Sequence, residues 1–84
     1  MVTPEQIEGW IRAGLACEHL QVVGDGQHFE AIIVSPEFRG KLPVARHQRV
    51  YAALGERMKT DIHALSMQTL TPEEWAEHQQ AAHG

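Results

Sequence analysis

The sequence predicts an α+β domain in which a three-stranded mixed sheet carries helices on one face. Two Thr-Pro-Glu segments, at residues 3–5 and 71–73, are typical of helix starts, and apolar residues recur at helical spacing after the first of them and again from 44 to 54. Short β-branched runs separate these helices, so the predicted order is α-β-β-α-α-β-α. The crossover between the second and third strands requires a parallel pair, which makes the sheet mixed.

The first helix is expected to begin after Thr3, which can cap it, with Pro4 in the first turn and Gln6 completing a capping box. It ends near Cys17. A strand over 19–23 follows, then a turn at the glycines of 24–26, and then a strand over 29–35 with a nearly continuous apolar centre. These signals predict a β-hairpin directly after the first helix.

After a loop that contains Gly40 and Pro43, the second half of the chain again shows helix and strand signals. A helix follows, with an inner stripe of Val44, His47, Val50, Tyr51 and Leu54. Residues 55–60 form either a short helix or a frayed end, 62–69 a third strand, and 72–78 a last short helix before a frayed polar tail over 79–84. The predicted core comprises Ile7, Trp10, Ile11, Ile32, Val34, Val50 and Leu54.

Length and composition exclude several classes of protein. Eighty-four residues, 43% hydrophobic and 21% charged, leave room for a single globular domain, residues 1–84, with a small core. No apolar run approaches the roughly 20 residues that span a bilayer, and a single cysteine, Cys17, forms no internal disulfide. We therefore expect a cytoplasmic protein that does not associate with membranes.

The charge distribution sets one segment apart. The net charge is −4, yet residues 39–49, here called the basic segment, contain four cations and no acid: Arg39, Lys41, Arg46 and Arg49. The remainder carries three cations against eleven acids, a balance of −8. The basic segment is either a solvated face or a surface that contacts nucleic-acid phosphates, and the overall acidity makes any such binding weak and salt-dependent.

Motifs of enzymes are absent from the sequence. It contains no Gly-x-Ser-x-Gly, His-Glu-x-x-His or Walker motif, and Gly24-x-Gly26 alone indicates a turn. Cys17 lies near the C-terminal end of the first predicted helix, where the helix dipole disfavours a thiolate. The sequence therefore predicts a protein without enzymatic activity.

The six histidines are the residues best suited to bind a metal. His63 lies at the start of the third predicted strand, and His28 lies where the hairpin loop joins the second. Two imidazoles from neighbouring strands can bind one metal ion or one face of a cluster, but they leave the coordination incomplete, so a partner must supply the rest. His47 is an accessory candidate on the inner stripe of its helix, whereas His19, His78 and His83 are expected at the periphery.

The element order is also that of bacterial-type (type II) KH modules, which clamp RNA through a Gly-x-x-Gly loop. No two glycines in this chain lie three residues apart, so that loop is missing. The prediction is a KH-like fold without the nucleic-acid clamp.

Several separated motifs, in order, resemble those of the BolA family. The central one is Phe38-Arg39-Gly40-Lys41 followed by residues 44–51, Val-Ala-Arg-His-Gln-Arg-Val-Tyr. A second runs from Ile62-His63-Ala64 to Trp75, and residues 24–30 resemble the histidine-loop, bacterial acid-stress type. The resemblance covers about residues 5 to 78.

The resemblance implies a KH-like fold and a partnership with monothiol glutaredoxins around a shared 2Fe–2S cluster. The glutaredoxin cysteine and a glutathione thiolate would hold one side, and His63 and His28 the other, with no cluster tightly bound to the isolated chain. The family is also described as stress-responsive transcription regulators that contact DNA through the helix carrying Arg46 and Arg49. Alone, the chain is expected to be a monomer or weak homodimer.

These observations and the resemblance leave three functions to be tested. The first is a glutaredoxin-binding adaptor for iron–sulfur assembly, trafficking or redox and iron sensing. The second is DNA binding through the basic segment. The third is a small dimerising domain whose histidines bind nothing.

Overall fold

The computed structural model describes residues 1–83, and the side chains of residues 1–80. Its elements, in chain order, are α1 (Pro4–Gly14), β1 (His19–Gly24), β2 (His28–Val34), the 3-10 turn η1 (Pro36–Phe38), α2 (Pro43–Leu54), α3 (Arg57–Thr60), β3 (Ala64–Leu70) and α4 (Pro72–His83). This is the predicted order. Residues 57–60 form a short helix, which resolves the alternative between a helix and a frayed end.

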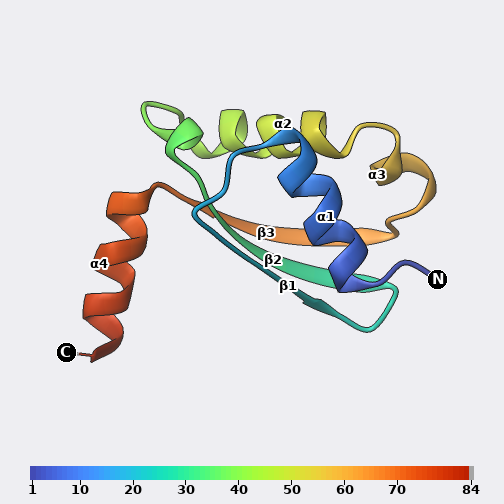
Figure 1. Cartoon of the computed structure of the whole chain (residues 1–84), viewed down its shortest axis with the longest axis horizontal. Coiled ribbons are helices and arrows are strands. Elements are labelled where there is room, and N and C mark those ends of the chain that lie inside the picture. Colours follow the sequence, from blue (N-terminus) through green and yellow to red (C-terminus); the bar gives the residue numbers. More distant parts are fainter. Residues whose placement is uncertain (84) are drawn as a thin grey trace.

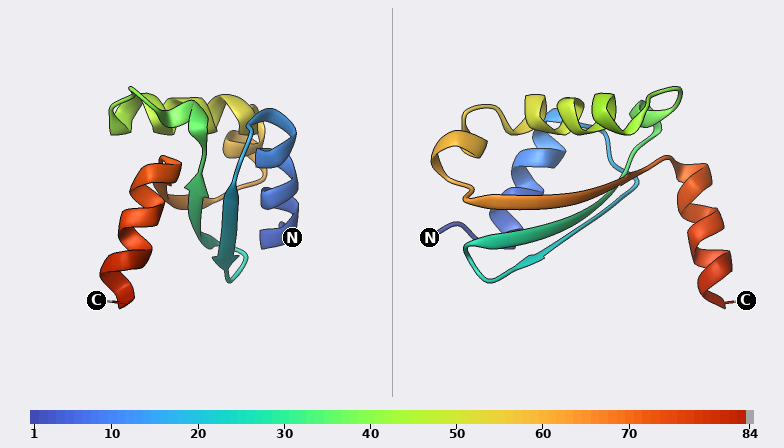
Figure 2. Two further views of the ribbon diagram at one scale, coloured as in Figure 1. Left: turned by 60° about the vertical axis from the view of Figure 1, so that its left-hand side comes forward. Right: turned by 180° about the vertical axis from the view of Figure 1, so that it is seen from behind.

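The sheet has the strand order β1-β2-β3. Strands β1 and β2 pair antiparallel, and β2 and β3 pair parallel, so the predicted mixed sheet is confirmed. The parallel pair is made possible by the crossover through α2 and α3. Figures 1 and 2 show α1, α2 and α3 together on one side of the sheet. Among the described residues, no helix lies across the other face, and α4 meets it at one end, where Trp75 stacks on His19.

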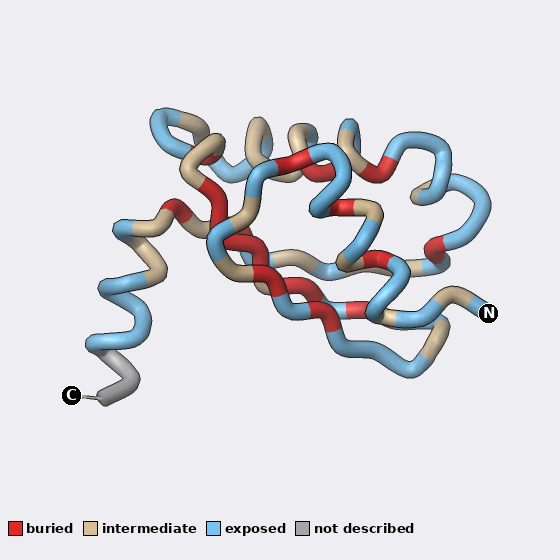
Figure 3. Tube along the Cα trace, in the orientation of Figure 1, coloured by how far each residue is buried: buried red, intermediate tan, exposed pale blue. Residues whose placement is uncertain are grey.

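The core lies between the sheet and these helices. Thr3 and Gln6 form the predicted capping box, each side chain accepting from the other residue's backbone N–H, and α1 turns Ile7 and Ile11 inward. Buried segments alternate with exposed ones along both helices and strands (Figure 3). Of the predicted core, all but Trp10 and Ile32 are buried. Trp10 is half-buried against the edge of the core, with the guanidinium of Arg57 over its ring, 4.1 Å from the ring centroid, and Ile32 faces the open side of the sheet.

Helix α2 is rotated relative to the prediction. Val50 and Leu54 face the core, but Val44 is 70% and Tyr51 42% exposed, so the predicted inner stripe is wrong at these two positions. Val44 and Tyr51 are seven residues apart and therefore share one stripe of the helix, which is turned outward. The sequence contains two apolar stripes here, and only tertiary packing decides which is buried.

Several predicted boundaries also differ; β1 ends one residue later than predicted, at Gly24, and β2 lies one residue earlier, over His28–Val34. Helix α1 ends at Gly14, three residues before Cys17, and β3 begins at Ala64, because buried Ile62 and exposed His63 precede the pairing. Helix α4 continues to His83, past the predicted end at 78. Its second half contains two alanines and two glutamines, which have high helix propensity.

Helix α4 begins after Thr71, which forms a second reciprocal cap. The N–H of Glu74 donates to the Thr71 hydroxyl, and the N–H of Thr71 donates to the Glu74 carboxylate. The helix leaves the end of β3 and projects away from the helical layer (Figures 1 and 2). Within residues 1–83, no helix has both the length and the apolar character needed to cross a membrane.

Candidate metal centre

His28 and His63 come together at one end of the sheet. His28 is the first residue of β2, and its partner across the parallel pair is Ala64, the first residue of β3. The N–H of Ala64 donates to the carbonyl of Gln27 at 3.1 Å. Because that hydrogen bond joins the direct neighbours of the two histidines, it fixes both side chains at the same edge.

The two rings are exposed and close. Their centroids lie 6.2 Å apart, and the ring planes are nearly perpendicular at 86°. A metal–imidazole bond of about 2 Å places a ring centroid roughly 3 Å from the metal. Two rings bound to one ion therefore have centroids at most about 6 Å apart, so the observed 6.2 Å requires a small rotation of one ring before both can bind the same ion; the donor set suits an iron, zinc or copper ion.

The pair is only part of a coordination shell. No group of three or more His, Cys, Asp or Glu side chains that could hold a metal occurs in the described part of the chain. Cys17 does not join it: its Sγ donates to the carbonyl of Leu15 at 3.4 Å, and burial raises the pKa of the thiol. Any further ligands of a metal bound to this pair would come from outside the described residues.

Asp25 shapes the loop that presents His28. One carboxylate oxygen accepts from the backbone N–H of His28 at 2.9 Å and from that of Gln27 at 3.0 Å. These hydrogen bonds, that of His28 first, lower the pKa of Asp25 below its usual range. Gly26 completes the turn with φ at +100°. The turn was predicted from its glycines without a role for Asp25, although an Asp-Gly pair in a hairpin is a known turn signal.

The remaining histidines lie elsewhere. His47 is half-buried on α2, and no ring contact among the described residues joins it to the pair. His19 and His78, expected at the periphery, both stack on Trp75, with centroids at 4.6 and 5.6 Å. The Nε2 of His19 is buried and has no hydrogen-bond partner in the described part of the molecule. The side chain of His83 lies outside the described residues.

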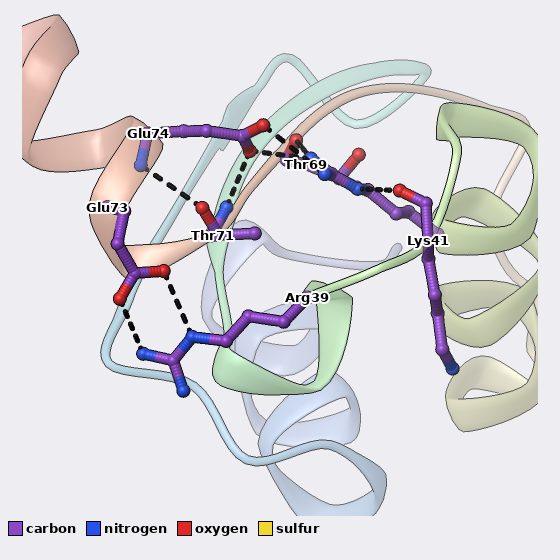
Figure 4. Close-up of polar contacts among 7 residues, drawn as sticks. Arg39, Lys41, Thr69, Thr71, Glu73 and Glu74 are labelled. Atoms are coloured by element: carbon purple, nitrogen blue, oxygen red, sulfur yellow. Dashed lines mark hydrogen bonds and ion pairs between the residues drawn. The ribbon is translucent and has the colours of Figure 1, made fainter.

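Three cations of the basic segment are held by glutamates. Arg39 donates two hydrogen bonds to Glu73, at 2.9 and 2.7 Å, and Arg49 pairs with Glu37 and donates to the carbonyl of Gly14. Figure 4 shows Arg39 facing Glu73, and the side chain of Lys41 pointing away from these contacts. The pairing lowers the pKa of Glu73, chiefly through the hydrogen bonds from Arg39.

Arg46 is the most enclosed of these cations, since only 12% of its side chain is exposed. Its guanidinium donates to the carbonyls of Lys41 and Thr69 and to the carboxylate of Glu74. Arg46 therefore joins α2, β3 and α4, and its donors are directed into the protein. Lys41 forms no ion pair with any described residue, so it is the member of the basic segment whose charge is most available.

Comparisons with known proteins agree with this architecture. A family model described as BolA-like protein matches residues 11–74. Protein BOLA2 of Arabidopsis thaliana is 45% identical over 80 residues, covering 89% of this chain and 85% of that protein. The DNA-binding transcriptional regulator BolA of Escherichia coli K12 is 34% identical over 85 residues, covering 89% and 81%. The structure of a BolA homologue from Coxiella burnetii superposes with a TM-score of 0.84 at 47% identity, covering 90% of this chain and 99% of that one. This chain therefore belongs to the BolA family.

Proposed function

We propose that this protein is a non-enzymatic adaptor that binds a monothiol glutaredoxin and shares a 2Fe–2S cluster with it. His63 and His28 supply the ligands of this chain. The glutaredoxin cysteine and a glutathione thiolate supply the others. The cluster is cargo that the pair of proteins assembles, carries or senses.

The observation that carries the proposal is the exposed pair of imidazoles, 6.2 Å apart, with no third ligand among the described residues. A structural zinc site would be closed by four protein ligands. Two imidazoles at an open edge are instead suited to meet thiolates that arrive on a second molecule. This incompleteness supports a shared site rather than a resident one.

The ligand chemistry fits a transferable cluster. Replacing thiolates by imidazoles on one iron makes a 2Fe–2S centre less negative and raises its reduction potential. Imidazole binds metal only in its neutral form, so the affinity falls as the pH drops and the rings protonate. These properties favour transfer or sensing over permanent storage.

The test is to mix the protein with a cluster-loaded monothiol glutaredoxin and glutathione, and to record visible absorption and circular dichroism. We expect a new spectrum that His63→Ala abolishes, while association of the cluster-free proteins persists. His28→Ala should give an altered and less stable cluster. His78→Ala, which removes an imidazole from the Trp75 stack, is the matched control and should leave the spectrum unchanged. A wild-type spectrum from His63→Ala would refute the ligand assignment.

DNA binding is the second candidate, because the name of the Escherichia coli relative includes it and the basic segment is the region that would contact phosphate. Three of the four cations are paired with glutamates. A phosphate must compete with each glutamate for its arginine, so we favour the adaptor function.

A further inference from the structure

The outer edge of β3 presents backbone groups without a partner among the described residues. The N–H of Ala64 donates to the carbonyl of Gln27, so Ala64 and every second residue after it direct their backbone groups toward β2. The backbone groups of Leu65, Met67 and Thr69 therefore point outward. The carbonyl of Thr69 accepts from a guanidinium of α2, whereas no such bond reaches the N–H or C=O of Leu65 or Met67 in the described part of the chain.

The opposite edge of the sheet, at β1, is protected. There the N–H of Val22 donates to the carboxylate of Glu8 at 3.2 Å, and α1 packs against the strand. Natural sheets protect their edges with charged residues, prolines, bulges or a covering helix. The strand β3, Ala-Leu-Ser-Met-Gln-Thr-Leu, contains neither a charge nor a proline, and from behind no other described helix or strand crosses it (Figure 2, right). The edge of β3 is therefore open to a further strand.

Helix α2 turns an uncharged flank toward the same side of the molecule. Its other flank packs against α1, where Ala53 lies against Gly14. Val44 and Tyr51 are nine and two positions from Ala53, which places them about 160–180° around the helix from it. Because α1 packs over β1 and α2 over β3, the exposed stripe of Val44 and Tyr51 lies above the outer edge of β3. This flank contains no Asp, Glu, Lys or Arg.

We propose that two copies of this chain pair through the outer edges of their β3 strands, antiparallel and centred on Ser66, to form one continuous sheet. In this register Leu65 lies opposite Met67 of the second copy, so the outward N–H of each donates to the outward C=O of the other. The carbonyl of Thr69 keeps its bond to Arg46. Ser66 lies opposite its own counterpart, and the two hydroxyls can hydrogen-bond across the pair.

A second copy matches this surface better than an unrelated extended peptide does. The two-fold axis of an antiparallel strand pair is perpendicular to the sheet, so both helical layers lie on one face and the two α2 helices run side by side. Val44 and Tyr51 of one copy then face the same stripe of the other, which buries the apolar flank that the single chain exposes. A peptide would supply only the strand. Neither β3 nor this flank carries a charge, so the pairing brings no like charges together.

Sedimentation velocity of the full chain, at concentrations up to about 1 mM, measures the association. Wild type should form dimers as the concentration rises. Ser66→Lys places two like charges directly opposite each other and should weaken the dimer at least tenfold. Gln68→Lys, also exposed and on the same face of β3, lies opposite Ala64 of the second copy and is the matched control, expected within threefold of wild type. Far-ultraviolet circular dichroism identifies the folded variants.

Cross-linking tests the register itself, in a Cys17→Ser background oxidised with glutathione disulfide. Residues opposite each other at the centre of the pair have Cα atoms about 4.5 Å apart, so Ser66→Cys should form a disulfide-linked dimer. The two copies of residue 68 are four residues out of register, about 14 Å, so Gln68→Cys should remain uncoupled.

A wild-type chain that stays monomeric up to about 1 mM, or equal yields of the two cross-links, would overturn the inference. So would a dimer that Ser66→Lys leaves intact. The adaptor function is tested separately, because it requires a glutaredoxin and not a second copy of this chain: the shared-cluster spectrum of a monomeric Ser66→Lys variant should match that of wild type.

Discussion

Arg46 and Glu74 join the centre of the domain to its last helix. The guanidinium of Arg46 reaches both carboxylate oxygens of Glu74, at 2.6 and 3.3 Å, and one of these oxygens also accepts from the N–H of Thr71 at 2.8 Å. The same arginine donates to the carbonyl of Thr69 in β3. One side chain thus connects the end of the sheet, the cap of α4 and helix α2, which gives it a structural role.

We predict that Arg46→Ala destabilises the fold by about 2–3 kcal/mol, because it leaves two carbonyls and a carboxylate without their donor. Urea denaturation followed by circular dichroism measures this. Lys41→Ala, a neighbouring cation whose side chain forms no ion pair among the described residues, should change the stability by less than about 0.5 kcal/mol. If the two substitutions lowered the free energy of unfolding by the same amount, the hydrogen bonds of Arg46 would make no specific contribution to stability.

The same network predicts a loss of stability in acid. Hydrogen bonds, first from Arg46 and then from the Thr71 N–H, lower the pKa of Glu74 from 4.5 to about 2. A carboxyl whose pKa is lower in the folded state stabilises the fold above the unfolded pKa, and this contribution fades as the pH falls from 4.5 toward 2. Since 43% of the Glu74 side chain is exposed, solvent screening reduces the contribution to about 1 kcal/mol. Denaturation midpoints at pH 6 and pH 3 should differ less in Glu74→Gln than in wild type, and an unchanged difference would assign the acid sensitivity to other groups.

Binding to duplex DNA should be weak and non-specific. With Arg39, Arg46 and Arg49 paired, we expect a dissociation constant no tighter than about 10⁻⁶ M near physiological salt, and a steep further loss as salt rises. Fluorescence anisotropy at two salt concentrations measures both quantities. Specific binding that persists at the higher salt and is lost in an Arg39→Glu, Arg49→Glu double variant would restore DNA as a target.

The sequence predicted the element order and the mixed sheet because capping residues, glycines and apolar spacing are local signals. It also predicted which histidines meet, because the starts of parallel strands lie at one edge. It failed where two local patterns compete: both stripes of α2 are apolar, and only packing turned Val44 outward. It also missed the glutamate partners of the basic segment, since Arg46 and Glu74 are 28 residues apart and no spacing rule relates them.

Asp25 should control how firmly His28 is presented to a metal. Its carboxylate holds the N–H groups of Gln27 and His28, and the carbonyl of Gln27 in turn accepts from Ala64, next to His63. Asp25→Ala removes the acceptor and loosens the loop, so we expect severalfold faster loss of the shared cluster and faster amide exchange at His28. Asp25→Asn keeps an acceptor oxygen and should retain most of the wild-type lifetime, because the effect depends on the hydrogen bonds. If Asp25→Asn loses the cluster as fast as Asp25→Ala while its amide exchange stays at the wild-type rate, the negative charge of Asp25 matters more than its hydrogen bonds.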